Sequence, residues 1–131
     1  MDTVPIGKTV LLVEDDVFLS NLLSSRLMKA GISVLKAYDG EEALKSLRAQ
    51  KPDLIVLDII IPKKSGFELM EDMRGEPILK DTPVIIVSNL GQEADVERAK
   101  QYGIKGYFVK AQNSIDDIAL AIKTYLETGS I

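Results

Sequence analysis

The sequence predicts an α/β protein with a doubly wound parallel sheet of five strands and five helices. Three observations support this fold class. Short apolar runs alternate five times with segments in which apolar residues recur at helical spacing. The runs over residues 54–57 and 84–87 contain no polar residue, as in strands that helices cover on both faces. Each run precedes a helix, which is the order of parallel strands joined by right-handed crossovers.

The first strand and helix have clear boundaries. Residues 9–13 are a β-branched and leucine run that stops at an acidic segment, so we expect a strand there. Apolar residues over 18–28 follow at helical spacing. Asp16 is expected to cap this helix, and Gly31 is the usual stop just past a last turn. Residues 32–37 read as the second strand.

The second and third helices are marked by their flanking residues. Residues 39–40 open the second helix, which ends before Pro52 because the residue preceding a proline disfavours helix. The third strand, residues 54–57, ends on an acid. After a proline-containing loop, Gly66 leads into a helix that closes around Gly75.

Two further strand and helix pairs complete the pattern. Residues 84–87 form the fourth strand, and residues 92–102 form the most polar helix, stopped by the glycine that follows. Residues 107–109 form the fifth strand. The closing helix, residues 115–126, carries an apolar stripe, and Ser114 is its expected cap.

The composition limits the chemistry. Of 131 residues, 46% are hydrophobic and 27% are charged, so the chain can build a core. It contains no cysteine and no histidine, which excludes thiol chemistry and the commonest general base. The net charge of −4 argues against direct nucleic-acid binding. No apolar run reaches the ~18 residues of a membrane span, and residues 1–8 lack a signal-peptide pattern.

These features predict one domain over residues 1–131, with a core from about residue 9 to residue 128. We expect no output domain, because no linker, repeat or second pattern interrupts the alternation. A chain without cysteine is also expected in the cytoplasm.

Polar residues follow four of the five strands. Glu14 and Asp15 come after the first, Asp58 after the third, Ser88 after the fourth and Lys110 after the fifth. Ligands of such sheets bind beyond the carboxyl ends of the strands, so these side chains are expected to converge. Clustered carboxylates repel one another, and a hard divalent cation relieves that repulsion. We therefore expect Mg²⁺ at this rim, with the serine and the lysine near a phosphoryl group.

Four segments, in this order and spacing, also carry a family resemblance. They are residues 12–16 (LVEDD), residues 57–62 (LDIIIP) with Gly66 four residues later, residues 86–88 (IVS) and residues 106–110 (GYFVK). From about residue 9 to residue 126 the chain resembles the receiver domains of two-component response regulators, of the kind seen in chemotaxis regulators. The resemblance implies a flavodoxin-like (βα)5 fold with strand order 2-1-3-4-5.

The resemblance also implies roles for the residues at the strand ends. Asp58 would be the phosphoacceptor, attacking a phosphohistidine on a partner kinase or histidine phosphotransfer protein. Asp15, Asp58 and the main-chain carbonyl of Ile60 would bind Mg²⁺ directly, and Glu14 would act through a coordinated water. Lys110 would pair with the phosphate. Such a protein is a phosphoacceptor switch and not an enzyme.

A switch would follow phosphorylation. By the resemblance, Ser88 would move its hydroxyl to the phosphate, and Tyr107 would turn inward into the vacated space. The surface of the fourth helix, fifth strand and fifth helix would then change and recruit a downstream protein.

The sequence departs from the family pattern after the lysine. Ala111 stands where the family usually has a proline, often after a cis bond, so either the loop differs or the fold imposes a cis bond. Asn89, directly after Ser88, stands where the family commonly has a small residue. The two positions that tune phosphate lifetime correspond to Ile60 and Leu90, whose apolar side chains cannot orient water, so we expect slow self-dephosphorylation.

Simpler interpretations exist for single residues. Ser88 is more often a turn residue, Lys110 a surface charge and Tyr107 an ordinary strand aromatic. Lys63 and Lys64 are expected to be solvated rather than to steer phosphate.

Three other functions compete with the switch. An aspartyl-nucleophile phosphatase would normally carry an acid at position 60, which is isoleucine, and a cap that this chain lacks. A nucleotide-binding module would need a glycine-rich loop where Glu14 and Asp15 stand. A receiver-like docking scaffold that takes no phosphate is the third alternative, and the intact acids argue against it.

Overall fold

The computed structural model describes residues 7–131, and its fold is the predicted one. The expectation about a signal peptide falls mostly on residues 1–6, which lie outside the described residues. Along residues 7–131 every helix is too short or too polar to cross a membrane. In chain order the elements are β1 Thr9–Val13, α1 Val17–Lys29, β2 Ser33–Ala37, α2 Gly40–Ala49, β3 Leu54–Leu57, α3 Gly66–Arg74, β4 Val84–Ser88, α4 Glu93–Lys100, β5 Gly106–Val109, the short 3-10 helix η1 Lys110–Gln112, and α5 Ile115–Thr128.

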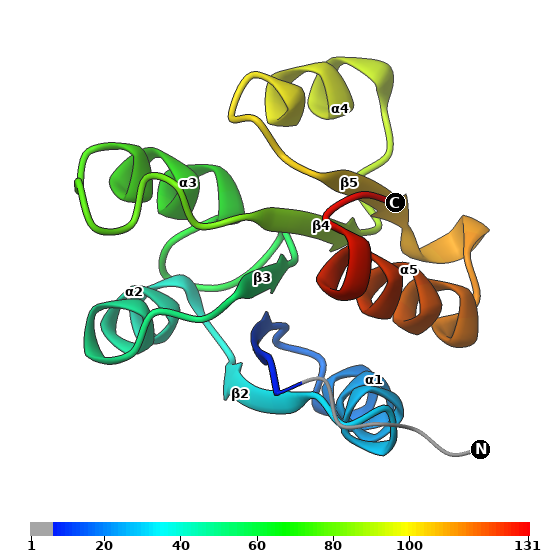
Figure 1. The fold of residues 1–131 in the computed structure, drawn as a ribbon. Coiled ribbons are helices and arrows are strands. Elements are labelled where there is room, and N and C mark those ends of the chain that lie inside the picture. The colour runs from blue at the N-terminus through cyan, green and yellow to red at the C-terminus, as the bar shows by residue number, and fades with distance from the viewer. Residues whose placement is uncertain (1–6) are drawn as a thin grey trace.

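The sheet is parallel throughout and has the order β2-β1-β3-β4-β5 (Figure 1), which confirms the implied strand order. Its register aligns the carboxyl ends of the central strands, because Val13 pairs with Leu57 and Leu57 pairs with Ile86. The residues that follow β1 and β3 therefore emerge side by side. The amide of Asp58 continues this ladder by donating to the Val13 carbonyl at 3.0 Å.

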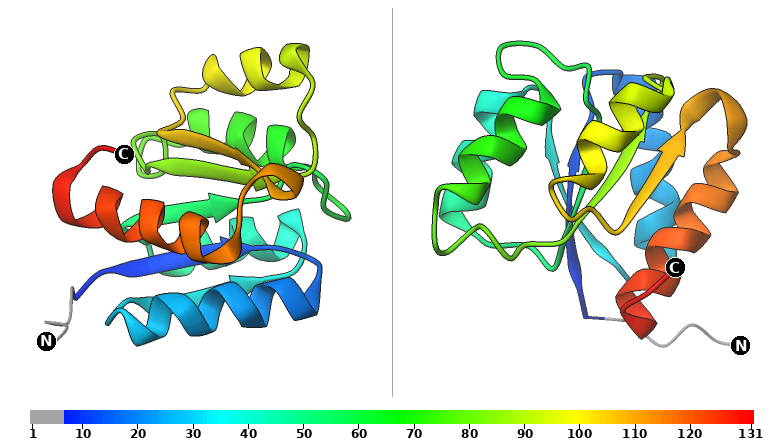
Figure 2. Two further views of the ribbon diagram at one scale, coloured as in Figure 1. Left: turned by 90° about the vertical axis from the view of Figure 1, so that its right-hand side faces the viewer. Right: turned by 90° about the horizontal axis from the view of Figure 1, so that it is seen from above.

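Helices cover both faces of the sheet. Helices α1 and α5 lie on one face, and α2, α3 and α4 lie on the other (Figure 1). The right-hand view of Figure 2 shows the strands running between these layers. Alternate strand residues point to opposite faces, as the two-residue period of a strand requires. Val10, Leu12 and Val56 pack with the residues of α1 and α5, whereas Leu11 and Ile55 pack on the other side.

The helix starts agree closely with the sequence signals. The Asp16 carboxylate accepts a hydrogen bond from the Leu19 amide at 3.1 Å, and Ser114 caps α5 through the Asp117 amide, also at 3.1 Å. Both predicted caps are confirmed. Ser65 and Glu68 form a capping box at the start of α3.

Helix α4 is shorter than the predicted range of residues 92–102. It ends at Lys100, and the chain then turns through Gly103, which has a φ of 72°. A left-handed residue here explains why glycine marks the stop. Tyr102 consequently leaves the helix and packs toward Phe67 of α3, with 6.4 Å between the ring centroids.

Candidate functional site

Three carboxylates meet at the carboxyl ends of β1 and β3. Glu14, Asp15 and Asp58 each offer an oxygen, and these oxygens lie within 4.8 Å of one another. Glu14 and Asp58 are buried, with exposed fractions of 3% and 5%, whereas Asp15 is exposed. The sequence-based expectation that these acids converge is therefore confirmed.

Lys110 reaches the same point from the end of β5. Its ammonium donates to Asp58 Oδ2 at 2.6 Å and lies 2.6 Å from Glu14 Oε1. No peptide bond within residues 7–131 is cis, and η1 begins at Lys110. Of the two alternatives raised by Ala111, the cis bond is therefore absent from residues 7–131, and the lysine reaches the acids through a trans bond.

The buried acids are held by the main chain as well as by the lysine. Glu14 Oε2 accepts from the Asp16 amide at 3.1 Å, and Asp58 Oδ1 accepts from the Ile60 amide at 3.0 Å. Each carboxylate thus has one oxygen fixed by an amide and the other by Lys110. Both are oriented without any contribution from Asp15.

The charges in this cluster do not balance. Three carboxylates share one ammonium, and two of them are removed from water. Burial raises the pKa of Glu14 above its ordinary value of 4.5, while hydrogen bonds from Lys110 and from the Asp16 amide act in the opposite direction. Burial lowers the pKa of Lys110, but its hydrogen bonds to Asp58 and Glu14 outweigh this and raise it overall.

A divalent cation with oxygen ligands fits this donor set. The cluster offers carboxylate oxygens alone, two of them preoriented, and it keeps an excess of negative charge that one ammonium does not neutralise. Asp15, exposed at the edge, leaves the cluster open to solvent on one side. Hard cations such as Mg²⁺ keep several waters when they bind proteins, which suits an open acidic site.

Ser88 at the end of β4 and Tyr107 in β5 are linked through one residue, Leu90. Ser88 is fully buried, and its hydroxyl oxygen accepts from the Leu90 amide at 3.2 Å. The Tyr107 hydroxyl donates to the Leu90 carbonyl. Burial raises the pKa of Tyr107, with smaller contributions from the carboxylates of Asp95 and Asp58. Sequence reasoning named Leu90 only for its side chain and missed the role of its main chain.

The loop after β3 positions Ile60. Its side chain is 58% exposed, and its amide holds Asp58. Gly66 makes this loop possible, because a Cβ there would lie 2.8 Å from the Asp58 carbonyl oxygen and from Ile59 Cα. Any side chain at position 66 would therefore clash with the main chain after β3, which explains why glycine stands four residues after Pro62.

Gly40 is a second close contact of the loop, and sequence reasoning treated it only as part of a helix start. A Cβ on Gly40 would lie 1.9 Å from the Lys64 carbonyl oxygen, and the Gly40 amide donates to the Pro62 carbonyl at 3.2 Å. The Lys63 ammonium nitrogen lies 3.6 Å from Asp39 Oδ2. The start of α2 thus fixes the loop that carries Ile60.

The lysines of this loop also have partners. Besides the contact of Lys63 with Asp39, Lys64 pairs with Asp72 of α3 at 2.6 Å. Lys63 is 60% exposed, as expected of a solvated lysine, whereas Lys64 is only 26% exposed and forms a close ion pair with Asp72, which the sequence did not predict.

A parallel sheet with clustered acids, a lysine and a hydroxyl at its carboxyl ends defines a class of phosphoacceptor signalling modules. Comparison with known proteins agrees. Residues 10–123 match the family model described as the response regulator receiver domain. The chain belongs to this family, whose members act in two-component phosphorelay signalling as phosphoacceptor modules and not as enzymes.

Curated relatives include longer regulators. The chain is 36% identical over 103 residues to the probable transcriptional regulator ycf27 of Cyanophora paradoxa, covering 79% of this chain and 42% of the relative. It is 34% identical over 105 residues to the alkaline phosphatase synthesis transcriptional regulatory protein PhoP of Bacillus subtilis, covering 80% of this chain and 43% of that protein. The chain thus spans less than half the length of these relatives.

Solved structures share the fold over nearly their whole length. The Mn²⁺-bound response regulator Rcp1 is 29% identical, with a TM-score of 0.83 over 92% of this chain and 96% of that one. The phosphorylated cyanobacterial phytochrome response regulator RcpA is also 29% identical, with a TM-score of 0.84 over 95% of this chain and 96% of that one. Related structures have thus been described with a divalent metal and in a phosphorylated state.

Proposed function

We propose that this domain is a phosphorylation-dependent switch in which Asp58 accepts a phosphoryl group. The observation that carries the proposal is the convergence of Glu14, Asp15 and Asp58 on one point, with the Lys110 ammonium 2.6 Å from Asp58 Oδ2. A carboxylate oxygen of Asp58 attacks the phosphorus of a phosphohistidine, the P–N bond breaks, and the histidine nitrogen leaves with its electron pair. The product is an aspartyl phosphate.

Asp15, Asp58 and the main-chain carbonyl of Ile60 would hold Mg²⁺ directly, and Glu14 would hold it through a water. When bound, the cation neutralises negative charge on the transferring phosphoryl group. The support from this chain is its donor set, an open acidic cluster with an excess of negative charge. The Asp58 and Glu14 carboxylates are already oriented by main-chain amides, so their side chains lose little conformational freedom when a cation binds.

Lys110 and Ser88 would stabilise the phosphorylated state. The Lys110 ammonium already contacts Asp58 and carries its charge in a half-buried setting, where it can pair with a phosphate oxygen. The Ser88 hydroxyl would leave the Leu90 amide and donate to another phosphate oxygen. Both groups act by position and charge, which is most of what phosphoryl transfer requires from a protein.

The output of the switch would pass through Leu90 and Tyr107. Once Ser88 turns to the phosphate, the Leu90 amide loses its acceptor, and the Leu90 carbonyl can move away from the Tyr107 hydroxyl. Tyr107 would then turn inward, and the surface formed by α4, β5 and α5 would change. Only Ala99 is buried within α4, so this helix is weakly tied to the core and well suited to move.

The proposed partners are a sensor histidine kinase or a histidine phosphotransfer protein upstream and a protein target of the α4, β5 and α5 surface downstream. We place this exchange in the cytoplasm. The net charge of −4 is unfavourable for direct contact with nucleic acid. One domain over residues 1–131 would suffice for the switch itself.

Acetyl phosphate with Mg²⁺ tests the proposal directly. Intact-protein mass spectrometry should show the gain of one phosphoryl group in the wild-type protein and none in Asp58→Asn. Asp53→Asn is the matched control, because Asp53 stands at the opposite end of β3, where its carboxylate accepts from the Thr9 amide. A gain that survives in Asp58→Asn would contradict the assignment, and no gain in the wild-type protein would favour the docking scaffold.

A further inference from the structure

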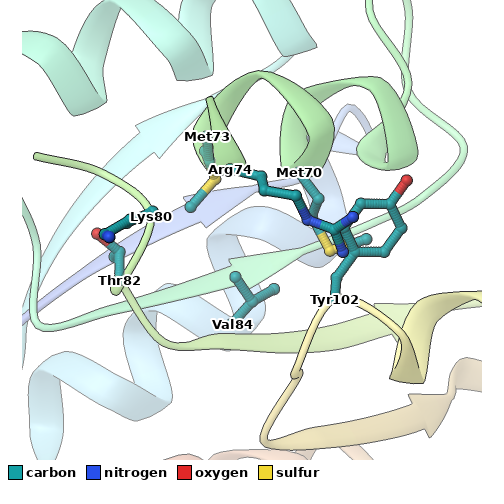
Figure 3. A pocket seen from close by; sticks show the side chains of 7 residues that line it. All are labelled: Met70, Met73, Arg74, Lys80, Thr82, Val84 and Tyr102. Atoms are coloured by element: carbon teal, nitrogen blue, oxygen red, sulfur yellow. The ribbon is translucent and has the colours of Figure 1, made fainter. Parts of the chain in front are cut away.

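A small cavity lies at the amino end of the sheet, away from the acidic cluster. It encloses about 60 Å³ between α3, the start of β4 and the turn after α4. Met70, Met73 and Val84 form its apolar walls (Figure 3). Since β4 runs from Val84 at this cavity to Ser88 at the carboxyl edge of the sheet, where the acids of β1 and β3 also emerge, the two places are separated by the length of a strand.

The lining of this cavity carries two cations and no acid. Figure 3 shows Lys80 and Thr82 on one side and Arg74 with Tyr102 on the other. Among residues 7–131, Lys80 has no carboxylate within 4.0 Å, and Arg74 has only Glu71, at 3.9 Å on its own helix. The chain holds 20 acidic residues against 16 basic ones, so an acid-free cavity with two cations is not what its composition favours.

The Arg74 guanidinium is held in place before any ligand arrives. It lies 4.4 Å from the centroid of the Tyr102 ring, and its Nη2 donates to the Gln101 carbonyl at 3.0 Å. A guanidinium has five N–H donors, so others remain for a ligand. Although the Arg74 side chain is 54% exposed, these two contacts restrict it, so less conformational entropy is lost when it binds one.

Thr82 adds a hydroxyl without a hydrogen-bond partner. The residue is 6% exposed, and its Oγ1 is buried with no acceptor or donor within reach among the described residues. Buried hydroxyls nearly always form a hydrogen bond, so this group calls for a partner. Thr82 lines the cavity on the same side as Lys80. Its Oγ1 exposes less than 1 Å², so the side chain has to rotate before the hydroxyl can donate to a ligand there.

We propose that this cavity binds a small free oxyanion, with Lys80 and Arg74 on opposite sides of it and the Thr82 hydroxyl as a third donor. The volume of 60 Å³ holds about four water-sized groups, which matches a phosphate ion or a short carboxylate and excludes a nucleotide. A larger hollow of about 240 Å³ adjoins it, shares Lys80 and Thr82, and is lined by both Asp81 and Lys105, so the smaller cavity is the one of the two whose lining has no acid. The proposal does not depend on phosphorylation of Asp58.

Nuclear magnetic resonance of the ¹⁵N-labelled protein tests it. Sodium phosphate and sodium acetate are titrated separately, with EDTA present and with sodium chloride at equal ionic strength as the reference. We expect saturable shifts at the amides of Arg74, Thr82 and Tyr102 with at least one of the two anions. Saturation by phosphate identifies a tetrahedral ligand, and saturation by acetate alone identifies a carboxylate.

Variants separate a built site from general attraction to positive charge. Lys80→Met and Thr82→Val should each weaken binding at least about threefold. Thr82→Val removes a hydroxyl that has no partner, so the fold should be kept. Lys45→Met makes the same charge change on the exposed face of α2, away from this cavity, and should leave binding unchanged.

Three results would overturn the proposal. The amide chemical shifts could change linearly with the concentration of both anions, they could match the changes caused by chloride, or they could be equally large in Lys80→Met. Asp58→Asn should bind the anion as the wild-type protein does. A failure of the switch proposal is therefore distinguishable from a failure of this one.

Discussion

Ser88 and Tyr107 hold the same residue from two sides. The Ser88 hydroxyl oxygen accepts from the Leu90 amide at 3.2 Å, and the Tyr107 hydroxyl donates to the Leu90 carbonyl. Leu90 lies in the connection between β4 and α4, beside the start of the proposed output surface. Loss of either hydrogen bond therefore frees the Leu90 main chain on one side, and the hydrogen bond on its other side is affected as well.

The first prediction concerns the strength of this link. Tyr107→Phe removes the hydroxyl that holds the Leu90 carbonyl, so the free energy of unfolding should fall by about 1 kcal/mol. Urea denaturation measures this. Tyr125→Phe is the control, because its ring packs at the edge of the core on the other face of the sheet and its hydroxyl makes no hydrogen bond within residues 7–131. Equal losses in the two variants would show that the Tyr107 hydrogen bond contributes nothing.

The second prediction concerns Lys110, which among residues 7–131 is the only cation in contact with the buried acids. Lys110→Met leaves Glu14 and Asp58 without a counter-charge, so in EDTA the protein should lose about 3 kcal/mol of stability. Mg²⁺ should restore more stability to this variant than to the wild-type protein. Lys64→Met breaks a partly exposed pair with Asp72 and should cost no more than about 1 kcal/mol. A loss of that smaller size in Lys110→Met would argue against a charge imbalance in the cluster.

The third prediction follows from the raised pKa of Glu14. In the metal-free protein the folded chain holds this proton more tightly than the unfolded chain does. The associated stability is complete below the unfolded pKa near 4.5 and is lost as the pH rises through the higher folded pKa. Glu14→Gln does not titrate, so its stability relative to wild type should increase with pH over this window and then level off. Urea denaturation in EDTA at a series of pH values measures it, and a constant difference would contradict the raised pKa.

The fourth prediction assigns a positioning role to Gly40. Gly40→Ala would place a Cβ 1.9 Å from the Lys64 carbonyl oxygen, which must move with the loop that carries Ile60. Stability should fall by about 2 kcal/mol, and Mg²⁺ affinity should fall in protein that remains folded. At Gly75 the nearest atom to an added Cβ is 3.6 Å away, so Gly75→Ala should leave Mg²⁺ affinity unchanged. Unchanged Mg²⁺ affinity in Gly40→Ala would limit Gly40 to a structural role.

Local signals in the sequence were enough to predict the fold. Apolar runs, caps such as Asp16 and Ser114, and stops such as Gly31 act within a few residues, and the structure agrees with them. One error was the end of α4, where Tyr102 leaves the helix to pack against α3. That contact joins segments about 35 residues apart, so helical periodicity cannot reveal it.

The acidic cluster was predictable for a different reason. Parallel strands end at one edge of a sheet, so the residues after β1, β3, β4 and β5 had to meet. The contacts that position them were not predictable. The main chain of Leu90 between two hydroxyls, the approach of Gly40 to Lys64 and the cation-lined cavity at Thr82 all depend on atoms brought together by packing. No residue type in the sequence marks them.

The central claim is that acids from β1 and β3 form one cation site. Isothermal titration with Mg²⁺ tests it most directly, with Asp15→Asn as the test variant and Asp16→Asn as the neighbouring control. Asp16 lies outside the cluster and caps α1, a role that asparagine can keep. We predict one bound Mg²⁺ per chain, an affinity lowered at least about tenfold in Asp15→Asn, and no change in Asp16→Asn. Absence of Mg²⁺ uptake by the wild-type protein, or equal affinities in all three proteins, would contradict the account.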